Sequence, residues 1–135
     1  MKKRNSDVLR SLATEARLRV LECLRAGRAH PDDIARDLGI ARQAVDYHLQ
    51  ILCDLGVISK GAMFEQKGRP RVSYGITSEG QQLLDGLENA VLNYSDLLEE
   101  AYRRKQRMID DLLLDGEITE EEYRRRVKKL RSLRI

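Results

Sequence analysis

Residues 42–50 bring together side chains that form hydrogen bonds with nucleic acids. The polar members of this stretch are Arg42, Gln43, Asp46, Tyr47, His48 and Gln50. An arginine can bond the edge of a guanine through two nitrogens, and a glutamine can do the same with adenine. Polar side chains of these types also bind phosphates. The stretch therefore predicts contacts with the base edges and backbone of double-stranded DNA, with His48 and Gln50 toward the flanking backbone.

A helix must present these groups on one side. Val45, Leu49 and Leu52 recur at i, i+4 and i+7, which predicts the buried side of a helix over about residues 41–55. Residues 34–38 form a second short amphipathic run, and Gly39 stands between the two. Two short helices joined by a glycine turn are typical of a helix-turn-helix, whose second helix can enter a major groove.

The first turn of this recognition helix has two features that bear on binding. Its cap would be Ala41 or Ile40, and neither has a side-chain oxygen that could accept a backbone N–H. Either tertiary packing holds this end, or a DNA phosphate satisfies the free amides. Asp46 can accept from a cytosine or can orient Arg42 four residues earlier, and we favour the second interpretation.

A β-hairpin is expected directly after Gly56. Residues 57–60, 62–66 and 72–76 have strand-type composition around a turn that contains Gly68 and Pro70. The turn carries three cations without an acid among them: Lys67, Arg69 and Arg71. A hairpin of this kind is a wing whose cations could bind phosphates or a narrow minor groove. The alternative is an ordinary solvated turn.

Thr77 is expected to cap a long helix over residues 78–114, roughly 55 Å in length. Apolar residues then recur at alternating spacings of three and four for about four heptads, interrupted by Lys105. The apolar positions of this seam are Leu84, Leu87, Val91, Tyr94, Leu98, Ala101, Met108 and Leu112. A seam this long predicts a partner, most simply the same helix of a second copy in a homodimer. The alternative is a helix that bends back onto its own domain.

A last helix is predicted over about residues 120–133. Thr119 and Glu122 form a capping-box pattern, and Tyr123, Val127 and Leu130 form a stripe that suits an antiparallel hairpin with residues 109–113. The other face is basic and consists of Arg124, Arg125, Arg126, Lys128, Lys129, Arg131 and Arg134. These cations could pair with acids of the preceding helix, touch DNA phosphates or bind another anionic partner.

The distribution of charge distinguishes the two parts of the chain, and the composition excludes several classes of function. Residues 1–76 hold 14 Lys and Arg against 9 Asp and Glu, whereas residues 77–135 hold 11 against 13. The first part is therefore the better candidate to meet a polyanion. We find no membrane-spanning run, signal peptide, metal-ligand spacing, cofactor motif or catalytic constellation. The sequence thus predicts a cytoplasmic protein that is not an enzyme and that binds no metal, cofactor or membrane. It does not indicate whether a small-molecule effector exists.

Several of these segments resemble winged-helix regulators of the ArsR type. The matching segments are residues 12–21 (LATEARLRVL), 34–40 (IARDLGI), 43–49 (QAVDYHL), 55–58 (LGVI) and 68–74 (GRPRVSY). The resemblance covers about residues 8–82 and implies a dimeric regulator whose recognition helices read two half-sites. Two features depart from that family: no Cys-x-Cys pair precedes Ile34, and Ala41 replaces the usual Ser or Thr. Metal sensing by that route is therefore not expected.

The C-terminal part carries a separate resemblance. Residues 113–123 (LLDGEITEEEY) are similar to a short helical-hairpin module found at many prokaryotic C-termini, which implies oligomerisation. A long helix followed by this hairpin resembles archaeal relatives.

The sequence therefore predicts a mainly α fold with one small β-hairpin. Residues 1–77 would form the winged helix-turn-helix domain, and residues 78–135 a dimerisation region of a long helix and a short one. The expected function is sequence-specific binding of double-stranded DNA by a homodimeric regulator of transcription. The alternative is a winged-helix module that binds protein and uses its basic tail on an anionic partner.

Overall fold

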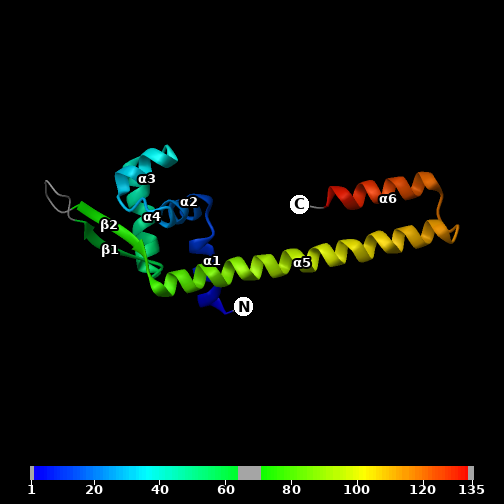
Figure 1. The fold of residues 1–135 in the computed structure, drawn as a ribbon, viewed down its shortest axis with the longest axis horizontal. Helices are drawn as coiled ribbons and strands as arrows, with labels where there is room; N and C mark the ends of the chain where they lie inside the picture. Colours follow the sequence, from blue (N-terminus) through cyan, green and yellow to red (C-terminus); the bar gives the residue numbers. More distant parts are fainter. Residues whose placement is uncertain (1, 64–70, 134–135) are drawn as a thin grey trace. The chain divides into compact units, whose positions relative to one another are not determined.

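The structure is a computed structural model that describes residues 2–63 and 71–133 of the 135-residue chain (Figure 1). The described residues form six helices and one two-stranded antiparallel sheet. In chain order these are α1 (Lys3–Leu12), α2 (Glu15–Arg25), α3 (Pro31–Leu38), α4 (Arg42–Asp54), β1 (Ile58–Met63), β2 (Arg71–Ile76), α5 (Ser78–Leu114) and α6 (Glu120–Ser132). The predicted fold class, mainly α with a small β-hairpin, is confirmed.

Local signals start and stop the helices of the first part. Thr14 accepts a hydrogen bond from the backbone N–H of Arg17 at 3.2 Å, which caps α2. Pro31 occupies the start of α3, and Nδ1 of His30 caps that helix by accepting from the N–H of Asp32 at 3.1 Å. Gly39 ends α3 with a φ of 66°, a conformation that side chains disfavour.

The core of this part lies among α2, α3 and α4, which pack against one another. Five side chains from these helices have no exposed surface at all: Val20, Ile34, Val45, Leu49 and Leu52. Three of the five belong to α4 and have the helical spacing that predicted its inner side. Each such burial stabilises the fold by about 1.5–3 kcal/mol, so α4 is held firmly in one rotation about its axis.

The hairpin follows α4 directly. β1 and β2 pair antiparallel from Ile58 opposite Ile76 to Met63 opposite Arg71. The N–H of Tyr74 donates to the carbonyl of Ala29 at 2.9 Å, which ties β2 to the segment before α3. The predicted wing cations Lys67 and Arg69 lie outside the described residues.

The start of α5 is fixed on the first part of the chain. Thr77 Oγ1 accepts from the N–H of Gly80 at 2.9 Å, and its hydroxyl donates to the carbonyl of Gly56 at 2.7 Å. Gly80 is buried, and a Cβ there would lie 2.1 Å from the carbonyl oxygen of Val57. Only glycine allows the helix to pass the backbone so closely.

Two compact units make up the chain, residues 1–85 and 86–135. Their division falls inside α5, whereas we predicted domains that meet between residues 77 and 78. The first turns of α5 go with the first unit because Gly80 and Leu84 are buried. The helix itself spans the predicted residues without interruption.

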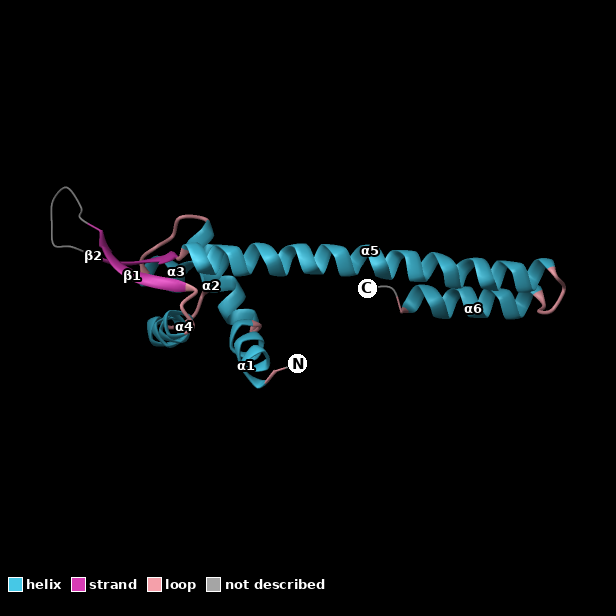
Figure 2. Ribbon diagram, turned by 90° about the horizontal axis from the view of Figure 1, so that it is seen from below, coloured by secondary structure: helices cyan, strands magenta, loops and turns pink. Residues whose placement is uncertain are grey.

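The second unit is a hairpin in which α6 lies antiparallel beside α5 (Figure 2). The Tyr123 hydroxyl donates to Asp110 of α5 at 2.7 Å, and this bond lowers the pKa of that carboxyl. Val127 and Leu130 are buried, as their stripe predicted. Thr119 Oγ1 caps α6 by accepting from the N–H of Glu122 at 3.1 Å. None of the described helices has the length and apolar character needed to cross a membrane.

The ion pairs of three arginines on α6 bear on the interpretation that its basic face pairs with acids of α5. Arg124 pairs with Glu120 at 3.8 Å, while Arg125 and Arg126 both pair with Glu122. These acids stand in the first turn of α6 itself. Pairing of these three arginines with the acids of α5 is therefore wrong, and intrahelical pairs of this kind contribute little to stability.

The close passage of α5 over Val57 makes a testable prediction. Gly80→Ala should lower the free energy of unfolding by about 1–3 kcal/mol, since the added methyl group must push backbone away. Gly86→Ala is the matched control in the same helix, because a Cβ at that position meets nothing within 4 Å. That change should instead raise stability by up to about 1 kcal/mol. Urea unfolding measures both, and equal stability of the Gly80→Ala variant and the wild type would contradict this contact.

Candidate nucleic-acid interface

The outer side of α4 is polar and open. The exposed polar residues of α4 include Arg42, Gln43, Asp46, Tyr47 and Gln50. Tyr47 as a whole residue keeps 61% of its surface accessible. The opposite side of the same helix is fully buried. Packing of that apolar side therefore turns the predicted base-reading groups outward together.

Arg42 is held by two carboxylates. Its Nε donates to Oδ1 of Asp46 at 3.1 Å, which is the orienting contact that the i, i+4 spacing suggested. Its Nη1 donates to Oδ1 of Asp32 at 2.6 Å. Hydrogen bonding from Arg42 lowers the pKa of the Asp32 carboxyl. Sequence reasoning missed Asp32 because it stands ten residues earlier, on α3, at no helical spacing from Arg42.

The other polar side chains of α4 differ in whether they already form hydrogen bonds within the protein. Within the described residues the side chain of Gln43 makes no hydrogen bond, so its amide is available to a ligand. The amide of Gln50 donates to Asp54 at 2.8 Å, one turn along the helix. Asp46 is already engaged by Arg42, so its role in the free protein is to orient that arginine.

His48 lies differently from the rest. Its side chain is half-buried, and its Nδ1 is enclosed without a hydrogen-bond partner in the described part of the chain. Burial lowers the pKa of His48, and the charge of Arg17 lowers it further. Arg17 is fixed in turn, because its Nη1 donates to the carbonyl of Ser11 at 2.6 Å. Nδ1 of His48 is thus not available to a phosphate, so the predicted contact with the DNA backbone would use the other ring nitrogen, Nε2.

The N-terminus of α4 has no side-chain cap. Ala41 is the capping residue and provides no hydrogen-bond acceptor, as predicted. The N-cap residue thus provides no side-chain partner for the first N–H groups of α4, and Ala41, Arg42 and Gln43 are exposed residues. Free amides at the positive end of a helix dipole bind anions such as phosphate.

The base of the wing adds one described cation near this surface. Arg71 begins β2 and is half-buried, and its charge acts on Asp32 to lower the pKa of that carboxyl further. Cations on both the recognition helix and the wing therefore lower the pKa of Asp32.

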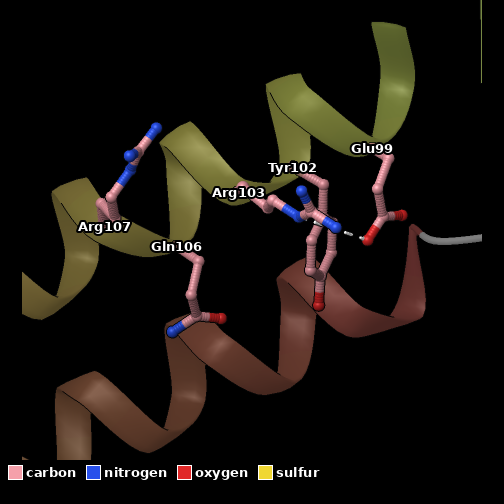
Figure 3. Close-up of a pocket in the computed structure, with 5 residues that line it drawn as sticks. All are labelled: Glu99, Tyr102, Arg103, Gln106 and Arg107. Atoms are coloured by element: carbon pink, nitrogen blue, oxygen red, sulfur yellow. Dashed lines mark ion pairs between the residues drawn. The ribbon is translucent and has the colours of Figure 1, made fainter. Parts of the chain in front are cut away.

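Hollows on the second unit are lined by residues of α5, in some cases together with residues of α6. One of about 410 Å³ is lined by Glu99, Tyr102, Arg103, Gln106 and Arg107 (Figure 3). Tyr102 and Gln106 point toward α6, and Arg103 pairs with Glu99 at 3.8 Å. Among the residues described, no group of three or more His, Cys, Asp and Glu is arranged to hold a metal ion.

The arrangement of α2–α4 followed by β1 and β2 is a winged helix-turn-helix. Residues 14–60 match the family model described as bacterial regulatory protein, arsR family. The chain therefore has the winged helix-turn-helix fold, and its helix-turn-helix is similar to that of arsR-family regulators. No match is found among curated protein sequences.

Solved structures share this fold at low sequence identity. A MarR-family transcriptional regulator from Enterococcus faecalis V583 is 22% identical with a TM-score of 0.57, over 77% of this chain and 94% of that one. Diamide-treated YodB from B. subtilis is 15% identical with a TM-score of 0.58, over 72% and 94%. NadR, solved in complex with 4-hydroxyphenylacetate, is 23% identical with a TM-score of 0.50, over 82% and 79%. These likenesses bear on the fold alone.

The enclosed position of His48 predicts a pH dependence of stability. Because its pKa is lowered in the folded state, the unfolded chain binds the proton more readily. The neutral ring thus contributes stability above the ordinary histidine pKa of about 6.5, and this contribution is lost as pH falls through the lower folded value. His48→Asn should flatten the decline of unfolding free energy between about pH 7 and pH 5.

Urea unfolding at several pH values measures this slope. Gln43→Asn is the control, since it changes an exposed neutral side chain of the same helix and leaves both histidines in place. That variant should keep the wild-type slope. An unchanged slope in His48→Asn would contradict the proposed burial effect.

Proposed function

We propose that this chain binds specific sequences of double-stranded DNA as a homodimer and thereby regulates transcription. The observation that carries the proposal is the outer side of α4, where Arg42, Gln43 and Tyr47 stand exposed over a fully buried apolar side. A rigid helix with exposed hydrogen-bonding groups on one side is what major-groove reading requires.

Each group has a separable role in this proposal. Arg42 and Gln43 read base edges, with Asp46 holding the arginine and Tyr47 supplying apolar contact. Gln50, the uncapped start of α4 and Nε2 of His48 bind the flanking backbone. The wing cations Lys67, Arg69 and Arg71 add contacts that do not depend on sequence. Phosphate contacts set affinity and base contacts set specificity, so the two groups can be tested apart.

Exposure of the seam on α5 supports the homodimer. Four seam residues stay widely exposed: Val91 at 63%, Tyr94 at 60%, Leu98 at 50% and Met108 at 67%. Leu87, Ala101 and Leu112 are half-buried, and Leu84 is buried in the first unit. Large apolar side chains gathered along one helix are typical of an interaction surface. Their alternating spacing fits a second helix of the same kind, which makes another copy of α5 the simplest partner.

The protein-interaction alternative has one observation in its favour. Residues 31–54 contain five aspartates and two arginines, so the helix-turn-helix itself is acidic. A gel shift with random duplex at two salt concentrations separates the two functions. Binding at low salt that weakens steeply with added salt supports the DNA function, because phosphate contacts release counterions. Absence of any shift at low salt would favour the protein-binding function.

The base-reading role of Arg42 and Gln43 can be measured on a duplex of about 30 bp selected from a random library. Arg42→Ala and Gln43→Ala should each lose roughly 5- to 150-fold in the ratio of selected to scrambled affinity, because each removes a contact worth ~1–3 kcal/mol of discrimination. Arg19→Ala is a control with the same charge change at an exposed position of α2. If Arg42→Ala bound both duplexes as tightly as wild type does, α4 would not be the reading helix.

The dimer can be tested at Leu98, which lies in the middle of the exposed seam. Leu98→Glu should yield monomers in sedimentation, because two carboxylates would face each other across an apolar contact. Affinity for a duplex with two half-sites should fall at least ~10-fold as the second copy is lost. Asn93→Glu adds the same charge on the same helix outside the seam, and it should leave the dimer intact. A wild-type protein that sediments as a monomer would rule out this assembly.

A further inference from the structure

Both arginines of the helix-turn-helix are bonded to carboxylates in the free protein. Arg36 pairs with Asp33 at 3.2 Å, one turn back along α3. Arg42 pairs with Asp46 on its own helix and with Asp32 on α3. The cations of the recognition surface are therefore already bonded to carboxylates before DNA binds. Any contact between DNA and Arg42 must compete with the bonds from Arg42 to Asp32 and Asp46.

The two carboxylates bind different edges of the Arg42 guanidinium. Asp46 holds Nε at 3.1 Å, beside the aliphatic stem, whereas Asp32 holds the terminal Nη1 at 2.6 Å. The pair of terminal nitrogens is the edge that an arginine extends toward O6 and N7 of guanine. Asp46 leaves this edge free, but Asp32 occupies half of it. Reading a base through the terminal edge therefore displaces Asp32 and can keep Asp46.

We propose that Asp32 is a specificity-determining residue: it holds the base-reading arginine in the free protein and makes Arg42 bind base edges in preference to phosphates. The inference rests on the proposed DNA-binding function and adds a role for an acid on the other helix of the motif.

The exchange of partners explains why Asp32 would act unequally on different DNA. A phosphate group can accept two charge-assisted hydrogen bonds from Arg42, which replace the bond that Asp32 already provides. The displaced carboxylate then also faces the negative backbone. A guanine edge offers two hydrogen bonds and carries no net charge. Displacing Asp32 is thus compensated at a matching base pair, whereas at a phosphate the gain is offset by repulsion between the freed carboxylate and the backbone.

Asp32 is itself accessible to solvent, with 62% of its side chain exposed. Its hold on Arg42 is accordingly screened by salt. The difference between selected and scrambled DNA that depends on Asp32 should therefore shrink as ionic strength rises.

Asp32→Asn tests the inference, and Asp33→Asn is its matched control. The control removes the same charge from the same turn of α3, but Asp33 bonds Arg36 and not Arg42. Dissociation constants are measured for the selected duplex and for a scrambled duplex of equal length. Asp32→Asn should tighten scrambled binding about 2- to 5-fold beyond the control and should lower the ratio of selected to scrambled affinity by a similar factor. Equal ratios in the two variants would overturn the inference.

A double-mutant cycle separates a contact through Arg42 from a general effect of charge. In the Arg42→Ala background, Asp32→Asn and Asp33→Asn should change scrambled binding equally, because the arginine that Asp32 holds is gone. An excess effect of Asp32→Asn that persists without Arg42 would overturn the inference and leave the proposed function standing. Wild-type protein that binds neither duplex would overturn the proposed function and the inference together.

Discussion

Burial of one side of α4 is the constraint on which the rest of the structure depends. Val45, Leu49 and Leu52 have no exposed surface and lie in a core shared with α2 and α3. Rotating α4 by one residue, about 100°, would expose these side chains and bury charged ones, at a cost of several kcal/mol. The outward direction of Arg42 and Gln43 is thus a consequence of apolar packing behind them. A reading surface made this way needs no loop to position it.

Much of this arrangement could be predicted from the sequence, because the signals are local. Spacings of three and four residues specify the buried side of α4 and the extent of α5, which spans residues 78–114 as predicted. Thr14, Pro31 and Thr119 mark helix starts by chemistry that involves only the next few residues. Asp46 also belongs to this class, since its contact with Arg42 is one helical turn long.

Contacts between different helices and strands could not be predicted, because no local sequence pattern marks them. Asp32 bonds Arg42 across the turn of the motif, and the charge of Arg17 on α2 lowers the pKa of His48 on α4. Neither pair has a periodic spacing, so no pattern along the chain favours these partners over other charged neighbours. The position of Gly80 is similar: nothing local distinguishes it from Gly86, yet only Gly80 passes close to the Val57 carbonyl. These features depend on packing among α2, α3, α4 and β1, which the pattern along one helix does not contain.

Charge placement links these local and tertiary features to the proposed function. Residues 1–76 hold 14 Lys and Arg, but only Arg36 and Arg42 lie within residues 31–54, and both are bonded to carboxylates. The reading surface therefore attracts phosphates weakly, and general attraction to DNA must come from cations elsewhere, such as Arg71 at the base of the wing. Weak general attraction at the reading helix lowers affinity for all sequences alike. A second copy, joined through the exposed seam of α5, would restore affinity at paired half-sites without restoring it at random DNA, because both reading helices must find their bases at once.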